Sequence, residues 1–134
     1  ELKSHYLYPA SLFADREPHV VTTILGSCVA VCLYDPELKQ GGINHYMLPL
    51  WNGQGLASPR YGNIAIERLI ERMTALGSKK DNLKAKVFGG GEVLETNFDS
   101  FHIGQRNIAI AMELLAEHGI PIVAKSVGSA IRAN

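Results

Sequence analysis

The apolar run at residues 28–34 constrains the fold more than any other feature of the chain. Its seven residues, CVAVCLY, contain no charged side chain and two β-branched valines. Such a run is typical of a strand that is buried on both faces of a sheet. Gly26 and Ser27 stand immediately before it, and Asp35 and Pro36 immediately after it, so turns are expected at both ends.

Further strands and two helices follow from the spacing of apolar residues. Strands are expected at residues 2–8, 19–25, 43–48, 83–88 and 120–127, and loops at 9–18 and 50–57. One amphipathic helix is expected to begin at Ser58-Pro59 and to end at Gly77, and a second to span about 104–118. The order predicts an α/β layered sandwich with a mixed β-sheet and helices packed outside. A Rossmann unit is not favoured, because no glycine fingerprint follows the first strand.

Composition places the chain among single globular domains. It has 134 residues, of which 46% are apolar and 19% charged, so we expect one domain over residues 1–134. The 13 basic residues balance the 13 acidic ones, which argues against a nucleic-acid partner. The longest apolar run has 7 residues, whereas about 20 are needed to span a bilayer, so membrane insertion is not expected. No secretion signal is visible, and a cytoplasmic location is the expectation.

Cys28 is the strongest candidate for chemistry. It directly follows the Gly26-Ser27 turn, where free backbone N–H groups would lower the pKa of its thiol and stabilise an oxyanion. The competing interpretation is a buried cysteine that packs as a small hydrophobe. Cys32 lies about 13 Å further along an extended strand. Neither a Cys28–Cys32 disulfide nor a metal site that uses both is therefore expected, and Cys32 is predicted to be a core residue.

His45 is the natural partner for a nucleophilic Cys28. A cysteine nucleophile needs a base within hydrogen-bond reach and a third group that orients the base. Thr22 or Thr23, on the strand before Cys28, could accept a hydrogen bond from His45. The alternative is that His45 is a structural histidine and that both threonines serve only the strand. The glycine run at residues 89–91 lacks the Lys-Ser/Thr pair of a phosphate-binding loop and predicts a tight turn or a close backbone approach.

Two longer motifs resemble a known family. The segments LGSCVAVCLYD at 25–35 and GGINHYMLP at 41–49 resemble the CheD chemotaxis family, whose members are chemoreceptor glutamine deamidases. Residues 6–9, 85–90 and 103–107 match it as well. The resemblance implies a Cys-His-Thr site in which Cys28 is the nucleophile and His45 the base. The family's threonine lies six residues before the cysteine, which selects Thr22 over Thr23.

The resemblance also implies a fold, a reaction and partners. The fold would be a layered α/β sandwich, similar to that of the cytotoxic necrotizing factor deamidases. The reaction would need no metal or organic cofactor. The substrate would be the cytoplasmic domain of a chemoreceptor, and the chemotaxis phosphatase CheC would be a further partner. Two other functions stay open: a non-catalytic adaptor that binds receptor or CheC, and a transglutaminase-like enzyme in which an amine intercepts the thioester.

Overall fold

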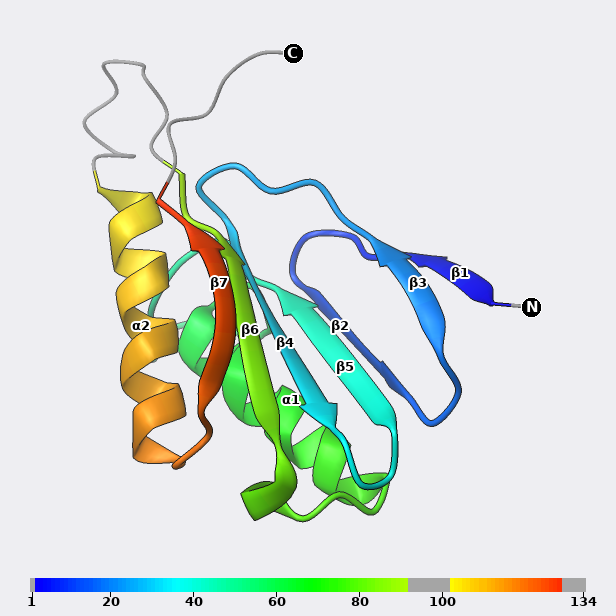
Figure 1. The fold of residues 1–134 in the computed structure, drawn as a ribbon. Coiled ribbons are helices and arrows are strands. Elements are labelled where there is room, and N and C mark those ends of the chain that lie inside the picture. Colours follow the sequence, from blue (N-terminus) through cyan, green and yellow to red (C-terminus); the bar gives the residue numbers. More distant parts are fainter. Residues whose placement is uncertain (1, 92–101, 129–134) are drawn as a thin grey trace.

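A computed structural model describes residues 2–91 and 102–128, and its centre is a mixed five-stranded sheet (Figure 1). The strand order in this sheet is β2-β5-β4-β6-β7, and only the β6–β7 pair is parallel. The sheet strands are β2 (Ser11–Asp15), β4 (Val29–Asp35), β5 (Gln40–His45), β6 (Lys84–Gly89) and β7 (Ile122–Val127). Two further strands, β1 (Lys3–Tyr6) and β3 (His19–Thr22), pair in parallel as a separate ribbon.

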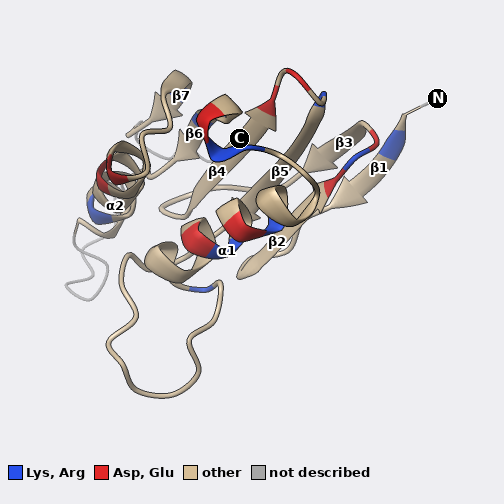
Figure 2. Cartoon of the chain, turned by 90° about the horizontal axis from the view of Figure 1, so that it is seen from below, with Lys and Arg blue, Asp and Glu red and all other residues tan. Residues whose placement is uncertain are grey.

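Both helices cover the same face of the sheet (Figure 1). Helix α1 (Gly62–Ala75) packs against β2, β5 and β4, and helix α2 (Ile103–Glu117) packs against β4 and β6. The core fills the space between these layers, and its fully buried members include Val29, Val31, Leu33, Val87, Ile66, Leu69, Met73 and Leu115. The charged residues of the two helices lie on the sides turned away from the sheet (Figure 2). This is the separation of apolar and polar faces that the helical spacing predicts.

The β1–β3 ribbon lies over the opposite face of the sheet, at the edge formed by β2. Phe13 of β2 stacks on His5 of β1 at 4.1 Å between ring centroids, and it meets the ring of His19 of β3 edge-on at 4.9 Å. The rest of that face borders an open groove, whose lining includes Cys32, Tyr34, Ile43, Lys86 and Phe88. The sheet is therefore covered by helices on one side and by the ribbon on part of the other.

The predicted α/β layered architecture is confirmed, and the run at 28–34 is the central strand β4. Its burial on both faces is confirmed only in part. Val29, Val31 and Leu33 face the helices and are buried, whereas Tyr34 is 46% exposed and Cys32 is half-buried. The reason is that both helices occupy the same side, so the far end of β4 has nothing over its other face.

Three local predictions are corrected by the structure. Residues 9–18, a loop in the sequence-based prediction, contain β2, an edge strand that is ordered by its backbone pairing with β5. The strand expected at residues 43–48 is β5, which runs from Gln40 to His45. It includes Gly42, where a side chain would collide with Leu69 of α1. Helix α1 begins at Gly62 and not at Ser58, because the backbone before it pairs with the segment that follows β5, through Tyr61 and Leu48.

Candidate active site

Cys28 lies in the bend between β3 and β4, and the glycine run at 89–91 holds that bend in place. The Cys28 carbonyl accepts a hydrogen bond from the Gly90 N–H at 2.8 Å, and the Gly26 carbonyl accepts one from the Gly91 N–H at 2.9 Å. Gly89 has a φ of +100°, and a side chain there would collide with the Cys28 carbonyl. The close backbone approach predicted for residues 89–91 is confirmed, and its role is to fix the Cys28 bend.

Asn107 of α2 joins this bend to the end of β5. Its Nδ2 group donates to the carbonyl of Ser27 at 3.0 Å and to the carbonyl of Met47 at 3.0 Å. Its own backbone carbonyl accepts a hydrogen bond from the Tyr46 hydroxyl. The residue before the candidate nucleophile and the residues after His45 are therefore tied to a single helical position.

Cys28 and His45 occupy diagonal positions across a pair of hydrogen-bonded residues. Val29 and Tyr46 exchange two backbone hydrogen bonds, of 3.1 and 2.9 Å. Cys28 comes just before Val29, and His45 just before Tyr46. Since side chains alternate along a strand, Cys28 and His45 project to the same face, opposite to that of Val29 and Tyr46. Diagonal neighbours of this kind have Cα atoms about 7–8 Å apart, and the β4–β5 register gives His45 two of them, Cys28 and Cys32.

His45 is almost fully buried, with 1% of its surface exposed, and its ring is oriented by a threonine. Nδ1 of His45 lies 2.7 Å from Oγ1 of Thr23, and the same oxygen donates its proton to the Leu7 carbonyl, also at 2.7 Å. A hydroxyl has one proton to donate. Thr23 must therefore accept from His45, which places the ring proton on Nδ1 and the lone pair on Nε2.

The lone pair on Nε2 is available as a base. Nε2 is buried and has no hydrogen-bond partner among the described residues. Burial lowers the pKa of His45 below its ordinary value, so the ring is neutral at physiological pH. Catalytic hydrogen bonds in ligand-free enzymes are often long and shorten when substrate binds. The arrangement suits a base that takes a proton from a group on the same face, and Cys28 is such a group.

The ionisation of Cys28 differs from the sequence-based expectation. Burial raises the pKa of its thiol, and a hydrogen bond from its own backbone N–H lowers it by less. The expected lowering by the turn is therefore present but is outweighed by desolvation. Both groups are therefore neutral at rest, so a Cys28 nucleophile would have to lose its proton during the reaction rather than before it.

The threonine selected from the family spacing is not the one at His45. Thr22 is exposed on the outer face of the ribbon, where β3 pairs it with Tyr6 of β1. Thr23, the next residue, is turned inward to His45. Neighbouring residues of an extended chain point to opposite faces, so a shift of one residue exchanges the two roles. The structure thus corrects the predicted His45 partner from Thr22 to Thr23.

Asn107 is the contact that the sequence reasoning missed. Asparagine is a poor residue for the interior of a helix, because its side chain competes for backbone hydrogen bonds. Here it occupies the buried face of α2, one turn after Ile103 and one turn before Ala111. A polar residue at a core position of a predicted helix was the available signal.

Two searches of the described residues concern other kinds of site. No described group of three or more His, Cys, Asp or Glu side chains is placed to hold a metal ion. Within residues 2–91 and 102–128, no helix is both long enough and apolar enough to cross a membrane.

Comparison with known proteins decides the family. A family model described as CheD chemotactic sensory transduction matches residues 47–132. A protein of Trichlorobacter lovleyi is 49% identical over 130 residues, which cover 97% of this chain and 81% of that protein. The chain belongs to the CheD family. A CheD relative from Sulfurimonas denitrificans is 48% identical over 131 residues, which cover 96% of this chain and 83% of that protein.

The names of these CheD relatives specify an activity. Both are called probable chemoreceptor glutamine deamidases, as is a protein of Rhodospirillum rubrum that is 44% identical over 92% of this chain and 69% of its own length. The family-model match begins at residue 47, after Cys28 and His45. The pairwise matches extend over the part of the chain that holds them, and so they carry the comparison of the site region.

Proposed function

We propose that this chain hydrolyses the side-chain amide of selected glutamines on chemoreceptors and converts them to glutamate. Cys28 is the nucleophile, His45 the acid–base group, and Thr23 the positioning residue. One observation carries the proposal: Thr23 fixes the proton of His45 on Nδ1 and leaves the Nε2 lone pair free on the face that Cys28 shares. The names of the relatives support the same reaction and the same class of substrate.

The first half of the reaction forms a thioester. Nε2 of His45 takes the proton of the Cys28 thiol as the sulfur attacks the carboxamide carbon of the substrate. The amide oxygen becomes negatively charged, and backbone N–H groups of the bend at 26–28 are the candidate donors to it. The carbon–nitrogen bond then breaks, the His45 Nε2 proton passes to the leaving nitrogen, and ammonia departs.

The second half regenerates the protein. Water attacks the thioester carbon and gives a proton to Nε2 of His45. The carbon–sulfur bond breaks, the sulfur recovers its proton from His45, and glutamate is released. Overall, one water is consumed and one ammonia is produced for each glutamine. Thr23 keeps the ring in one tautomer throughout, and when His45 becomes cationic its Nδ1 proton still has the Thr23 oxygen as acceptor.

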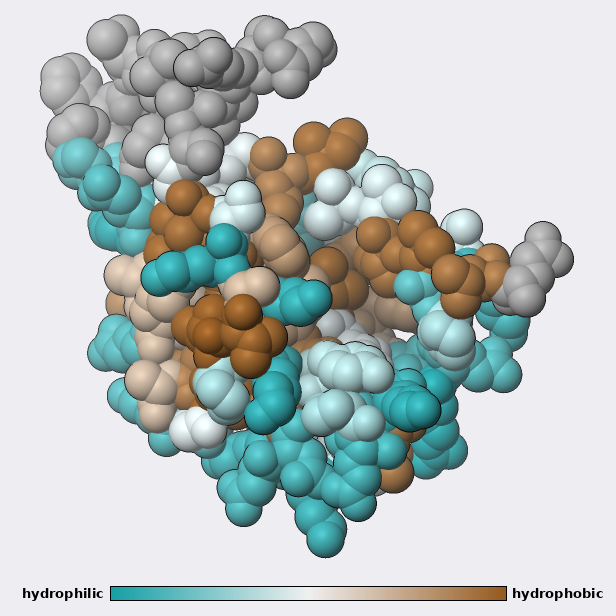
Figure 3. Space-filling view, viewed as in Figure 1, coloured by the Kyte–Doolittle hydropathy of each residue, from teal (hydrophilic) through white to brown (hydrophobic). Residues whose placement is uncertain are grey.

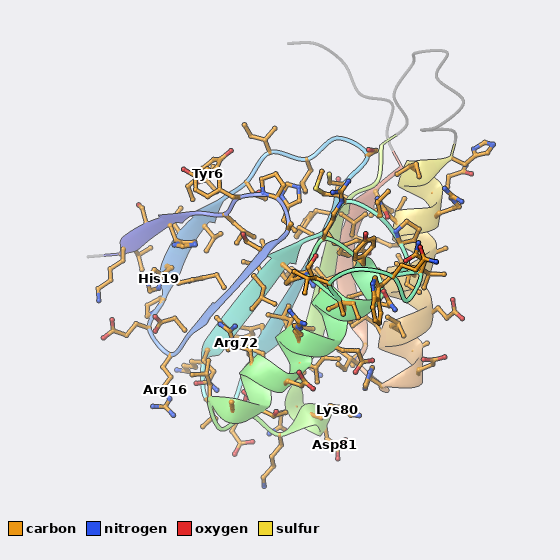
Figure 4. All side chains as sticks on the ribbon, turned by 180° about the vertical axis from the view of Figure 1, so that it is seen from behind. Tyr6, Arg16, His19, Arg72, Lys80 and Asp81 are labelled. Carbon is orange, nitrogen blue, oxygen red and sulfur yellow. The ribbon has the colours of Figure 1, made fainter. Side chains whose placement is uncertain are left out.

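The proposal places the protein in the cytoplasm with the signalling domain of a receptor as its partner. Apolar surface lies over β3 and the segment that follows it (Figure 3), and it includes Val20 and Ile24. Charged side chains such as Arg16, Arg72, Lys80 and Asp81 lie toward the opposite end of the molecule (Figure 4). An apolar surface close to Thr23 suits a protein substrate better than a free amino acid. We further propose CheC as a partner in organisms that have it.

The test is incubation with a receptor cytoplasmic fragment, followed by peptide mass spectrometry, with and without an added primary amine. Hydrolysis predicts conversion of glutamine to glutamate in both reactions. Amine-modified glutamine as the main product would establish the transglutaminase-like function instead. Tight binding of the fragment with no modified glutamine would establish the adaptor function and overturn the proposal.

A further inference from the structure

We propose that Asn107 is a positioning residue that sets the separation of Cys28 and His45. This inference rests on the proposed function. The geometry behind it is that of the hydrogen bonds made by Asn107. The amide group touches neither reacting atom. It acts on the two backbone segments that carry them.

One side chain holds both segments. Nδ2 donates at 3.0 Å to the carbonyl of Ser27, the residue before Cys28. It donates again at 3.0 Å to the carbonyl of Met47, two residues after His45. Asparagine offers two donors on one nitrogen, and no other side chain of its size does so.

The orientation of the Asn107 amide is fixed. Exchanging Nδ2 and Oδ1 would set an acceptor against two carbonyl oxygens, so the hydrogen-bond network allows only the present assignment. Oδ1 is left buried without a partner among the described residues. At this position both N–H donors of the amide are bonded, whereas its oxygen is not. Close packing alone would favour an apolar side chain here.

The helix that carries Asn107 is itself held against both segments. The Tyr46 hydroxyl donates to the Asn107 backbone carbonyl, and Tyr46 directly follows His45. At Gly104 a side chain would collide with the carbonyls of Gly90 and Gly91, so the start of α2 packs directly on the turn that bonds to the Cys28 bend. A movement of α2 would thus displace the Cys28 bend and the His45 strand end together, whereas loss of the Asn107 amide would leave the Val29–Tyr46 backbone pair to hold the two segments together.

The experiment compares Asn107→Leu and Asn107→Asp with wild type, two substitutions that nearly preserve side-chain size. The readouts are single-turnover deamidation and the rate at which iodoacetamide labels Cys28 across pH, each corrected for the folded fraction. We expect deamidation to fall by about 10²-fold in both variants, as displacements near 1 Å do elsewhere. We also expect slower labelling of Cys28 at neutral pH, because its base is no longer held in reach.

The pH profile separates positioning from a structural role. In Asn107→Asp, a carboxylate faces two carbonyl oxygens, and protonation restores one donor. Its labelling rate relative to wild type should therefore rise as pH falls, while the ratio for Asn107→Leu stays flat. Leu115→Val is the matched control, because it weakens the buried face of α2 without touching the bend. It should label and turn over as wild type does.

Two outcomes overturn the proposal. One is wild-type labelling and turnover in folded Asn107→Leu; the other is an equal loss in Leu115→Val. If the Asn107 variants do not fold, hydrogen exchange of the Asn107 side-chain amide in the wild-type protein decides. Protection of both amide protons supports the proposed positioning role, and exchange as fast as that of a free amide contradicts it. If wild type is inactive but Cys28 is labelled slowly in Asn107→Leu, the deamidase function is refuted and the positioning role of Asn107 is not.

Discussion

Nδ1 of His45 lies 2.7 Å from Oγ1 of Thr23, and that hydroxyl is already committed as a donor to the Leu7 carbonyl. Because the Thr23 hydroxyl has only one proton to donate, the tautomer of the buried His45 ring is fixed. The consequence is a free base on Nε2, which faces the same side of the sheet as Cys28. The following predictions test the parts of this arrangement separately.

Thr23→Ala should lower the single-turnover rate by about 10–10²-fold, part of what a positioned acid–base group contributes. The reason is that His45 loses the acceptor that holds its tautomer and tilt. Thr22→Ala is the matched control, since Thr22 is exposed on the outer face of the ribbon, and it should turn over normally. Thr23→Ser retains a hydroxyl and should recover most of the loss. An inactive Thr22→Ala together with a fully active Thr23→Ala would show that Thr22, as the family spacing implies, is the threonine that acts on His45.

Iodoacetamide should label Cys28 faster than Cys32 at neutral pH, because the thiol of Cys32 is held almost entirely protonated by its burial. Burial raises the pKa of both thiols, and that of Cys32 reaches about 11. Cys28 lies in the bend before β4, whereas Cys32 lies within the strand and is more deeply buried. His45→Gln should slow the labelling of Cys28 and leave Cys32 unchanged, as measured by peptide mapping. Equal labelling of the two cysteines would mean that Cys28 is an ordinary buried thiol.

Deamidation should decline on the acid side with a midpoint below 6.5, the ordinary histidine pKa, because burial lowers the pKa of His45. The same shift affects stability. The unfolded chain binds a proton at His45 more readily than the folded chain does, so the folded state loses stability as pH falls from about 6.5 through the lowered pKa. Urea unfolding at several pH values measures this slope. His45→Gln should reduce the slope, and an unchanged slope would contradict the assignment of a neutral, buried ring.

Gly89→Ala should destabilise the fold more than Gly53→Ala. Both glycines have a positive φ, of +100° and +89°, so each substitution carries backbone strain of about 1–3 kcal/mol. Only at Gly89 would the new side chain also collide with the Cys28 carbonyl, whereas nothing lies within 4 Å at Gly53. Urea denaturation gives both free energies. Equal losses would show that the turn does not press on the Cys28 bend.

The apolar pattern predicts the central strand β4, both helices and the layered architecture, because these depend on burial of apolar periods. It fails at β2, where residues 11–15 are ordered by pairing with β5. At the site, the residue types of Cys28 and His45 could be found from the sequence. The choice between Thr22 and Thr23 could not, since it depends on the face to which each residue of the ribbon turns. Asn107 acts through contacts 80 and 60 residues away in sequence, which a linear pattern does not reveal.

The most direct test of the account is a reaction in heavy-oxygen water, in which wild type and Cys28→Ala are each incubated with a receptor cytoplasmic fragment and the peptides are analysed by mass spectrometry. Cys32→Ala is the matched control, because that thiol lines the open groove rather than the bend. The account predicts glutamate that carries heavy oxygen from wild type and from Cys32→Ala, and unchanged glutamine from a folded Cys28→Ala. Conversion of glutamine by Cys28→Ala, or its absence with wild type, would contradict it.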